Sequence, residues 1–448
     1  MARSSFPTDR TVADELATVI HTLLGPDLPM RFRAWDGSEI GPPDAPVTIE
    51  VHSASALSHL LWSPNELGLA RAHVSGALDI EGDVFDLLAV RDVLAKRAEA
   101  RGDNDVSLRL GVRGQLALAR SLKRLGVLGR RPPLPPEESQ PKGIMHSRSR
   151  DASAIAHHYD VSNDFYRLLL GPSFTYSCAY WYDDALDLAT AQAAKYELIC
   201  RKLGLEPGMR LLDVGCGWGS MALHAAQHHG ARVVGITISQ EQAALAQERV
   251  AEAGLDDAVE IRVQDYRDIQ DGPFDAISSI GMFEHVGEPQ MGAYLANLHQ
   301  LLTPGGRLLN HAISRPDPAA TTGVDPQSFM GRYVFPDAAL LEVGTVVTAM
   351  QGVGLEVRDV QSLREHYALT LRAWVANLEG SWDRVQRLVG PGRARVWRLY
   401  LAGCALGFEQ NRTAIHQVLA VRSHQDGTSA IPATRSTFEV DRDHPVDR

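Results

Sequence analysis

The sequence predicts an α/β protein with a doubly wound, mostly parallel, Rossmann-like sheet and a smaller N-terminal α+β domain. Five apolar runs support this prediction: "MRLLDVG", "ARVVGITI", "VEIRVQD", "FDAISSIG" and "GRLLNHAIS". They alternate with helix-like segments, which is the spacing of βαβ units. The first run also ends in a glycine-rich turn, a feature typical of the first strand of a ligand-binding sheet.

The stretch "PPLPPEESQPKGIMHSRSR", residues 132–150, separates the two domains. Its prolines favour extended conformations that neither a helix nor an inner strand accepts. We therefore expect an N-terminal domain over 1–131, a linker over 132–150 and the main domain over 151–423. Residues 424–448 show little periodic apolar pattern and are expected to form a loosely ordered tail.

Composition excludes several classes of protein. A net charge of −11 argues against a general nucleic-acid binder. The four cysteines include no C-x-x-C pair, so neither a disulfide framework nor a zinc site is favoured. His228 and His229 are expected on a solvated helix surface, and no metal site is predicted. Because no apolar run resembles a signal peptide or a membrane span, we expect a cytoplasmic protein, soluble or peripheral to a membrane.

Residues 106–136 carry seven basic side chains and no acidic residue until the linker. They include Arg120, Lys123 and Arg124, interleaved with leucines. A basic amphipathic helix of this kind can lie on an anionic lipid surface. It can equally pack its apolar face on the core of the N-terminal domain and leave its basic face in solvent. The sequence leaves both alternatives open.

The stretch "MRLLDVGCGWGS" predicts a ligand-binding turn. An apolar strand ends in Asp213, and Gly215, Gly217 and Gly219 follow at alternate positions, so the backbone can turn tightly and a ligand can approach it. The pattern G-x-G-x-G differs from the dinucleotide fingerprint, and the chain has no phosphate-binding G-x-x-x-x-G-K-[ST] motif.

The next two strands end in further polar residues. Thr237 and Gln242 follow the second strand, and Asp265 and Tyr266 follow the third, placed to meet an adenine. Ligands of such sheets bind at the carboxyl ends of the strands, where these segments converge. An adenosyl ligand with a charged amino-acid tail fits these residues, so S-adenosylmethionine is the predicted cofactor and a class I methyltransferase the predicted fold.

Eight motifs occur in the order seen in cyclopropane fatty acid synthases and mycolic acid cyclopropane synthases, and the chain resembles that family over residues 154–420. The motifs are "HHYDVSNDFYRLLL", "YSCAYW", "LLDVGCGWGS", "GITISQEQ", "QDYRD", "GMFEHVG", "HAIS" and "YALTLRAW". The resemblance implies methyl transfer from S-adenosylmethionine to a cis double bond of a phospholipid acyl chain. The alkene attack creates a carbocation, so the site must remove a proton before water captures the cation.

The resemblance also implies a bound bicarbonate ion as the base. By the matching motifs, the carboxylate of Glu284 orients the ion, while the His311 side chain, the Ile313 backbone amide and the Tyr367 phenol hold it. Cys178 matches the cysteine whose backbone flanks the ion. Taken alone, Glu284 could instead be a structural carboxylate that caps the following helix. Bicarbonate both donates and accepts, so one carboxylate with several donors is complementary to it.

Three tyrosine and serine positions carry weaker expectations from the resemblance. Tyr176 and Ser177 are similar to residues that contact the methionine part of the cofactor, and Tyr159 to a tyrosine near the transferred methyl. A buried tyrosine is more often part of the core, and for Tyr159 alone that alternative is preferred.

The expected product is a methylene-branched (10-methylene) acyl chain, which a flavin- or nicotinamide-dependent reductase partner would convert to a 10-methyl branch. The alternative is a cyclopropane ring on the same substrate, and an alternative of another class is a non-catalytic protein that binds lipid or an adenosyl ligand. We expect the protein to act on unsaturated phospholipid at the inner face of the membrane and to bind no nucleic acid. A homo-oligomer is compatible with the sequence.

Overall fold

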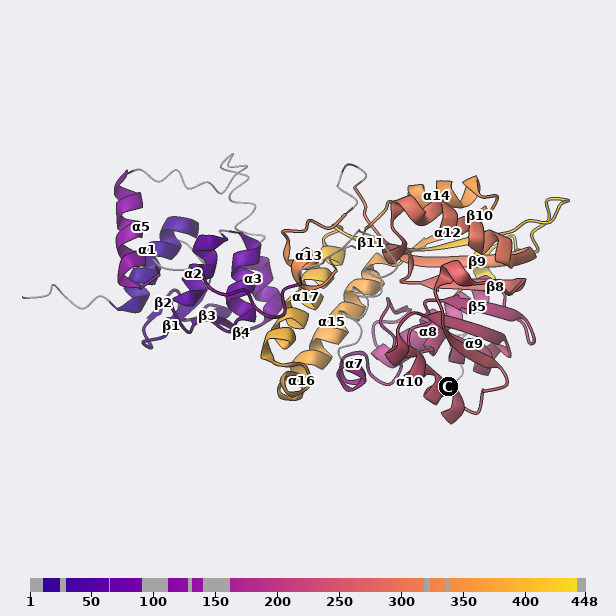
Figure 1. Cartoon of the computed structure of the whole chain (residues 1–448), viewed down its shortest axis with the longest axis horizontal. Coiled ribbons are helices and arrows are strands. Elements are labelled where there is room, and N and C mark those ends of the chain that lie inside the picture. The colour runs from indigo at the N-terminus through magenta and orange to yellow at the C-terminus, as the bar shows by residue number, and fades with distance from the viewer. Residues whose placement is uncertain are drawn as a thin grey trace, which may run out of the picture. The chain divides into compact units, whose positions relative to one another are not determined.

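The computed structural model describes residues 11–24, 30–63, 65–90, 112–127, 131–139, 162–317, 319, 323–335 and 339–440. The chain forms two compact units, drawn in Figure 1. Unit 1 comprises Met1–Ser139, Gln327–Tyr333 and Gly390–Gly403, and unit 2 comprises Gln140–Pro326, Val334–Val389 and Cys404–Arg448. The first boundary falls inside the stretch that the sequence predicts as a linker. The return of two later segments to unit 1 has no signal in the sequence.

Unit 1 combines a small mixed sheet with helices. The strands are β1 (Arg31–Ala34), β2 (Glu39–Ile40), β3 (Val47–Val51) and β4 (Leu78–Gly82), in the order β2-β1-β3-β4. β1 and β3 are parallel, and the other two pairs are antiparallel. The helices are α1 (Val12–Leu24), α2 (Ser55–Trp62), α3 (Glu66–Val74), α5 (Val112–Arg124), α13 (Phe329–Tyr333) and the first part of α17 (Pro391–Glu409).

Helix α5 lies within the basic segment and packs on the core of unit 1. Leu122 is buried in the same cluster as residues of α1 and the sheet. Ser121 Oγ and Arg124 Nη1 both bind the buried Glu15 carboxylate of α1, at 2.5 and 2.6 Å. Arg120 and Lys123 are exposed. The apolar face of α5 therefore packs in the core of unit 1. This is the arrangement in which the basic face is left in solvent, one of the two alternatives that the sequence leaves open.

The described start of the predicted linker, residues 132–139, also packs on unit 1. The Glu138 carboxylate is fully buried and accepts two hydrogen bonds from Arg71, at 2.8 and 2.6 Å. The Ser139 amide donates to the Arg332 carbonyl. A paired buried charge of this kind holds the chain in place, because breaking the pair would leave one charge buried without a partner.

Unit 2 is built on a seven-stranded sheet. The strands are β5 (Arg210–Val214), β6 (Arg232–Thr237), β7 (Val259–Val263), β8 (Phe274–Ile280), β9 (Leu302–Ser314), β10 (Glu356–Ser362) and β11 (Ala414–Val421). The helices are α7 (Asn163–Leu170), α8 (Leu188–Leu203), α9 (Ser220–His229), α10 (Gln240–Glu252), α11 (Phe283–Val286), α12 (Glu288–Leu301), α14 (Val343–Gly352), α15 (Arg364–Gly380) and α16 (Trp382–Val389). The short 3-10 helices η1 (Tyr266–Asp268) and η2 (Arg435–Thr437) complete it.

The strand order is β10-β11-β9-β8-β5-β6-β7, and β5 to β9 pair in parallel. β11 is antiparallel to both of its neighbours. All five apolar runs of the sequence are thus confirmed as strands β5–β9. The connections run one way from β5 to β7 and the other way from β8 to β9, so the carboxyl ends of β5 and β8 flank a topological switch point. Ligands bind at such points in open α/β sheets.

Alternate side chains of each strand fill two core layers, one on each face of the sheet. Leu211, Val233 and Ala276 pack with α8, α9 and α10, whereas Leu212 and Ile277 pack with α12 and α14. Figure 1 shows these helix groups on opposite sides of the strands. Phe438 and Val440 are buried in the first layer. This part of the C-terminal stretch packs on unit 2, although the sequence predicts a loose tail.

Candidate functional site

The glycine-rich turn lies where β5 ends and α9 begins. Gly215, Gly217 and Gly219 have φ angles of 76°, 55° and 78°, a region that side chains rarely adopt. A Cβ on Gly215 would lie 3.3 Å from Met282 Sδ, so a larger residue would be both strained and crowded. The turn therefore needs glycine for backbone conformation and for the close approach of the segment that follows β8.

Asp213, next to this turn, is a buried carboxylate with one unused oxygen. Its Oδ1 accepts a hydrogen bond from Ser278 Oγ at 2.7 Å. Its Oδ2 is buried without a hydrogen-bond partner among the described residues. Burial raises the pKa of Asp213 to about 6. Since a buried polar atom normally has a partner, Oδ2 marks a place for a ligand donor.

The ends of β6 and β7 present the other residues expected to bind the cofactor. Thr237 Oγ1 donates to Gln242 Oε1 at 2.9 Å, and both side chains are buried. The Asp265 carboxylate accepts hydrogen bonds from Arg267 Nε and Nη2, at 2.8 and 2.6 Å. Tyr266 packs edge-on against Tyr294. The Asp265 side chain is thus engaged by a neighbour, which the sequence does not predict.

Glu284 stands on the single turn of α11, directly after β8. Its Oε1 accepts a 2.7 Å hydrogen bond from the Ile313 amide of β9. Its Oε2 is buried with no hydrogen-bond partner in the described part of the chain. Burial raises the pKa of Glu284 to about 7. The Ile313 amide, expected to hold an ion, is engaged by Glu284 instead, because the buried carboxylate needs a donor.

His311 lies on β9, two residues before Ile313, and is neutral. Burial holds its pKa well below the usual imidazole value, and the positive charges of Lys195 and Lys202 act in the same direction. The Gln417 amide nitrogen lies 3.2 Å from Nδ1. Because an amide nitrogen only donates, Nδ1 accepts and Nε2 carries the proton. That Nε2 is buried without a partner among the described residues, so it is an unused donor.

Backbone pairing connects these residues to Cys178 and Tyr367. Ile313 pairs with Ile415 of β11, whose carbonyl accepts from the Leu363 amide. The Leu363 carbonyl in turn accepts from the Tyr367 amide and, at 3.7 Å, from the Cys178 thiol. These hydrogen bonds connect the segments that carry Glu284, His311 and Ile313 to those that carry Cys178 and Tyr367. Burial raises the pKa of the Cys178 thiol, which keeps it protonated.

Aromatic rings line the same region. Tyr176 stacks on Trp374, with ring centroids 5.2 Å apart, and Tyr367 meets Trp374 edge-on. Tyr367 also packs on Phe408. Aromatic faces attract positive charge, so this lining suits a reaction in which a cation develops. Tyr159, the remaining expected site residue, lies outside the described residues.

Lys195 of α8 is a site residue that the sequence analysis missed. It is fully buried, and its Nζ donates to Ser177 Oγ at 3.0 Å. Gln192, one turn earlier, donates to the Ser177 carbonyl at 2.8 Å. Burial lowers the pKa of Lys195 to about 7, while Cys178 and Asp213 raise it. The sequence does contain a sign that Lys195 is buried, because it lies on the same helix face as the apolar residues Ala191, Ala194 and Leu198.

The chain matches known proteins over most of its length. Residues 146–418 match the family model described as mycolic acid cyclopropane synthetase. A probable fatty acid methyltransferase of Mycobacterium tuberculosis is 43% identical, over 90% of this chain and 93% of that protein. The cyclopropane-fatty-acyl-phospholipid synthase of Escherichia coli K12 is 38% identical, over 63% of this chain and 71% of its own length. The crystal structure of mycolic acid cyclopropane synthase CmaA1 complexed with SAH and CTAB has a TM-score of 0.57 and 35% identity, over 60% of this chain and 98% of that chain.

Proposed function

Since this chain belongs to the mycolic acid cyclopropane synthetase family and is an S-adenosylmethionine-dependent methyltransferase, we propose that it methylates the cis double bond of an unsaturated phospholipid acyl chain. One observation carries the proposal. Glu284 Oε2 and His311 Nε2, an acceptor and a donor, are both buried without partners among the described residues, on α11 and on β9. Leaving both atoms unpaired costs stability, which a group bound between them would offset.

The residues at the switch point fit S-adenosylmethionine, which supplies the methyl group. The glycine turn lets the ligand approach the backbone, and Asp213 Oδ2 offers an acceptor to an ammonium or hydroxyl group. Thr237, Gln242 and Tyr266 lie at the ends of the neighbouring strands, and Tyr176 and Ser177 complete the set. Asp265 contributes through Arg267, which fixes its carboxylate.

The second group of residues fits bicarbonate, which would supply a base at this place. Glu284 Oε2 can accept a hydrogen bond from the protonated oxygen of the ion, and His311 Nε2 can donate to one of its other oxygens. Ile313 holds the carboxylate in its orientation. Tyr367 adds a phenol, and Cys178 places the backbone of its segment. The unequal use of the two Glu284 oxygens is what supports this assignment.

Two products follow from the same cation, and each loses one proton from the transferred methyl group. If the cation stays next to the methylated carbon, closure gives a cyclopropane. If a hydride first moves from the methylated carbon to its neighbour, loss of the proton gives the 10-methylene chain that we propose, which a reductase partner would later reduce to 10-methyl. The buried, aromatic lining protects either cation from water.

The test is to incubate the purified protein with S-adenosylmethionine and vesicles of oleoyl phospholipid. Released fatty acids are then compared by mass spectrometry with cyclopropane, methylene and methyl-branched standards. A gain of one carbon establishes acyl methylation, and the matching standard names the product. Tight cofactor binding without any gain on a panel of unsaturated phospholipids contradicts the proposal and favours a binding protein.

We propose further that the protein works at the inner face of the membrane as a peripheral protein. Within the described residues, no helix has the length and apolar character needed to cross a membrane. Arg120 and Lys123 of α5 are exposed and available to anionic lipid.

Changing Arg120, Lys123 and Arg124 together to glutamine should weaken binding to anionic vesicles about tenfold and reduce its dependence on salt. Vesicle co-sedimentation at two salt concentrations measures both effects. Because Arg124 also binds Glu15, the Arg120/Lys123 double variant is the matched control for folding. Binding as tight as in the unaltered protein would contradict a lipid role for α5.

A further inference from the structure

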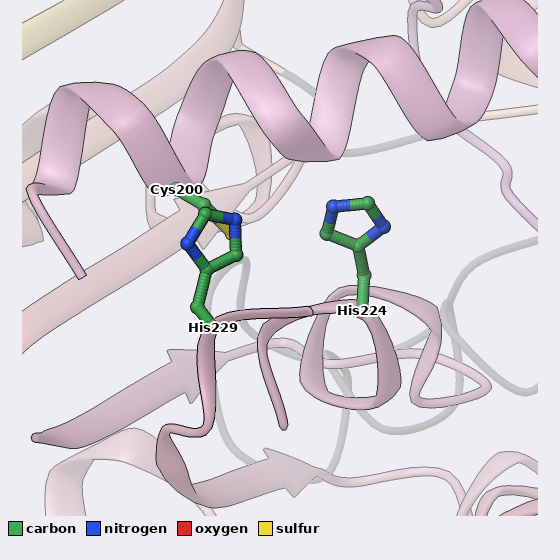
Figure 2. A group of neighbouring side chains, drawn as sticks. All are labelled: Cys200, His224 and His229. Carbon is green, nitrogen blue, oxygen red and sulfur yellow. The ribbon is translucent and has the colours of Figure 1, made fainter. Parts of the chain in front are cut away.

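A second cluster of side chains in unit 2 joins helices α8 and α9. Cys200 and Glu197 lie on one face of α8, and His224 and His229 lie on α9. Figure 2 shows both imidazole rings directed from α9 toward the helix that carries Cys200. One ligand atom each of Cys200, His224 and His229 lies within 4.8 Å of the other two. Glu197 Oε2 is 2.9 Å from His229 Nε2 and 3.4 Å from His224 Nε2.

From this convergence we propose that Cys200, His224, His229 and Glu197 bind one divalent transition-metal ion of the Zn²⁺ type. The donor set of one sulfur, two imidazole nitrogens and one carboxylate oxygen suits Zn²⁺ and excludes Mg²⁺ or Ca²⁺, which take oxygen ligands. Ligand atoms of a tetrahedral Zn²⁺ site are about 3.4–3.6 Å apart, as bond lengths of about 2.0–2.3 Å require. The ligand atoms of Cys200, His224 and His229 lie within 4.8 Å of one another, so the site tightens when the ion binds.

Charge and proton balance support the same ion. When the metal binds, the Cys200 thiol loses one proton to solvent, and each neutral imidazole coordinates through Nε2. The proton that each Nε2 shares with Glu197 in the metal-free protein then moves to Nδ1, so both rings stay neutral. The thiolate and the Glu197 carboxylate together neutralise the two positive charges of the ion. Arg201 Nε already holds the other oxygen of Glu197 at 2.7 Å, which is the kind of outer contact that orients a ligand.

The position of the cluster indicates a structural role. Helix α9 begins at Ser220, at the end of the sheet where the cofactor turn lies, and ends at His229, just before β6 starts. His224 and His229 therefore lie toward the opposite end of the strands. All four ligands come from the protein, which leaves no open position for a substrate. The ion would clamp α8, which carries Lys195 and Gln192, to α9, which follows the glycine turn.

The proposal is tested by metal titration of the full-length protein after treatment with EDTA. We expect one equivalent of Co²⁺ to give visible d–d bands and a near-ultraviolet thiolate-to-cobalt band, and Zn²⁺ to displace it. Cys200→Ser should abolish the thiolate band and weaken Zn²⁺ binding about 100-fold or more, since even the loss of an outer contact costs about 10- to 100-fold. Zn²⁺ should raise the Tm of the unaltered protein and leave that of Cys200→Ser unchanged.

Two substitutions serve as matched controls. His228→Gln alters a ring 4.5 Å from that of His224 that does not belong to the group, and Cys404→Ser removes a thiol elsewhere. Both should keep the cobalt bands. His229→Gln, at the end of its helix, is the second test if Cys200→Ser does not fold. The absence of a stoichiometric Co²⁺ spectrum, or a thiolate band that survives in both ligand variants, would establish a hydrogen-bonded network without metal and overturn the proposal.

Discussion

Unit 2 contains two clusters that each include a glutamate and a histidine: Glu284 with His311, and Glu197 with His224 and His229. The two glutamate carboxylates differ in how many hydrogen bonds they accept. Glu284 has one hydrogen bond to its Oε1 and none to its Oε2 within the described chain. Glu197 accepts from His224, His229 and Arg201. Burial raises the pKa of Glu284 to about 7. Burial acts on Glu197 in the same direction, but its three donors together hold the pKa of that carboxyl well below the usual range.

The difference separates a group kept for chemistry from a group kept for structure. A protein gains stability when a buried carboxylate is fully hydrogen-bonded and loses it when one oxygen is left unpaired. The Glu284 cluster is costly, and it lies at the switch point of the sheet, where ligands bind. The Glu197 cluster stabilises the contact between α8 and α9. The same change, glutamate to glutamine, should therefore have opposite consequences at the two places.

The largest effect is expected on turnover. Glu284→Gln should lower kcat by about two orders of magnitude or more, the scale of lost general-base assistance, because an uncharged amide would no longer orient the bicarbonate base as the carboxylate does. Binding of S-adenosylmethionine should change little. Glu197→Gln, the matched control, should leave kcat within about threefold of the unaltered protein. Near-full activity of Glu284→Gln would remove Glu284 from the mechanism.

For the free energy of unfolding, we expect Glu197→Gln to have the larger effect of the two substitutions. Glu197→Gln should lower the free energy of unfolding by about 1–3 kcal/mol, since it weakens hydrogen bonds from three donors to a charged group. Glu284→Gln should leave it unchanged or raise it at pH 8. There the folded protein must ionise a carboxyl whose folded pKa lies above its unfolded value, and that cost disappears with the charge. Urea unfolding measures both. If Glu284→Gln lost as much stability as Glu197→Gln, both carboxylates would have a structural role.

Lys195 should behave as a positioning residue of the first cluster. Lys195→Met keeps the length of the side chain but removes the donor to Ser177 Oγ, so the Kd for S-adenosylmethionine should rise about tenfold with a smaller change in kcat. If Lys195 acts through Ser177, the double variant with Ser177→Ala should be no worse than either single one. Calorimetric titration measures the four affinities. Fully additive losses would place the action of Lys195 elsewhere.

The sequence predicts features that are encoded locally, and it does not predict contacts that form only when the chain folds. The five strands of the parallel sheet, the glycine turn and Glu284 follow from local patterns, because each is encoded within about ten residues. Contacts between segments that are distant in the sequence are not encoded in this way. The bond from the Ile313 amide to Glu284, the pairing of Asp265 with Arg267, and the meeting of Cys200 with His224 each depend on tertiary packing. His229, expected on a solvated surface, is half-buried and paired with Glu197.

The smallest expected effect is the shape of the pH profile, and it tests both titratable groups of the first cluster at once. Glu284 must be ionised to accept the hydrogen bond that orients the bicarbonate base, so kcat/KM should fall as pH drops below about 7. Lys195 has the opposite sign, because it loses its positive charge as pH rises through about 7. Together the two groups should give kcat/KM a narrow maximum near neutral pH. Lys195→Met should remove the fall on the alkaline side and keep the fall on the acid side. A profile of kcat/KM that stays flat across this range would show that neither group titrates in the reaction, and that the unpaired oxygen of Glu284 has a structural cause.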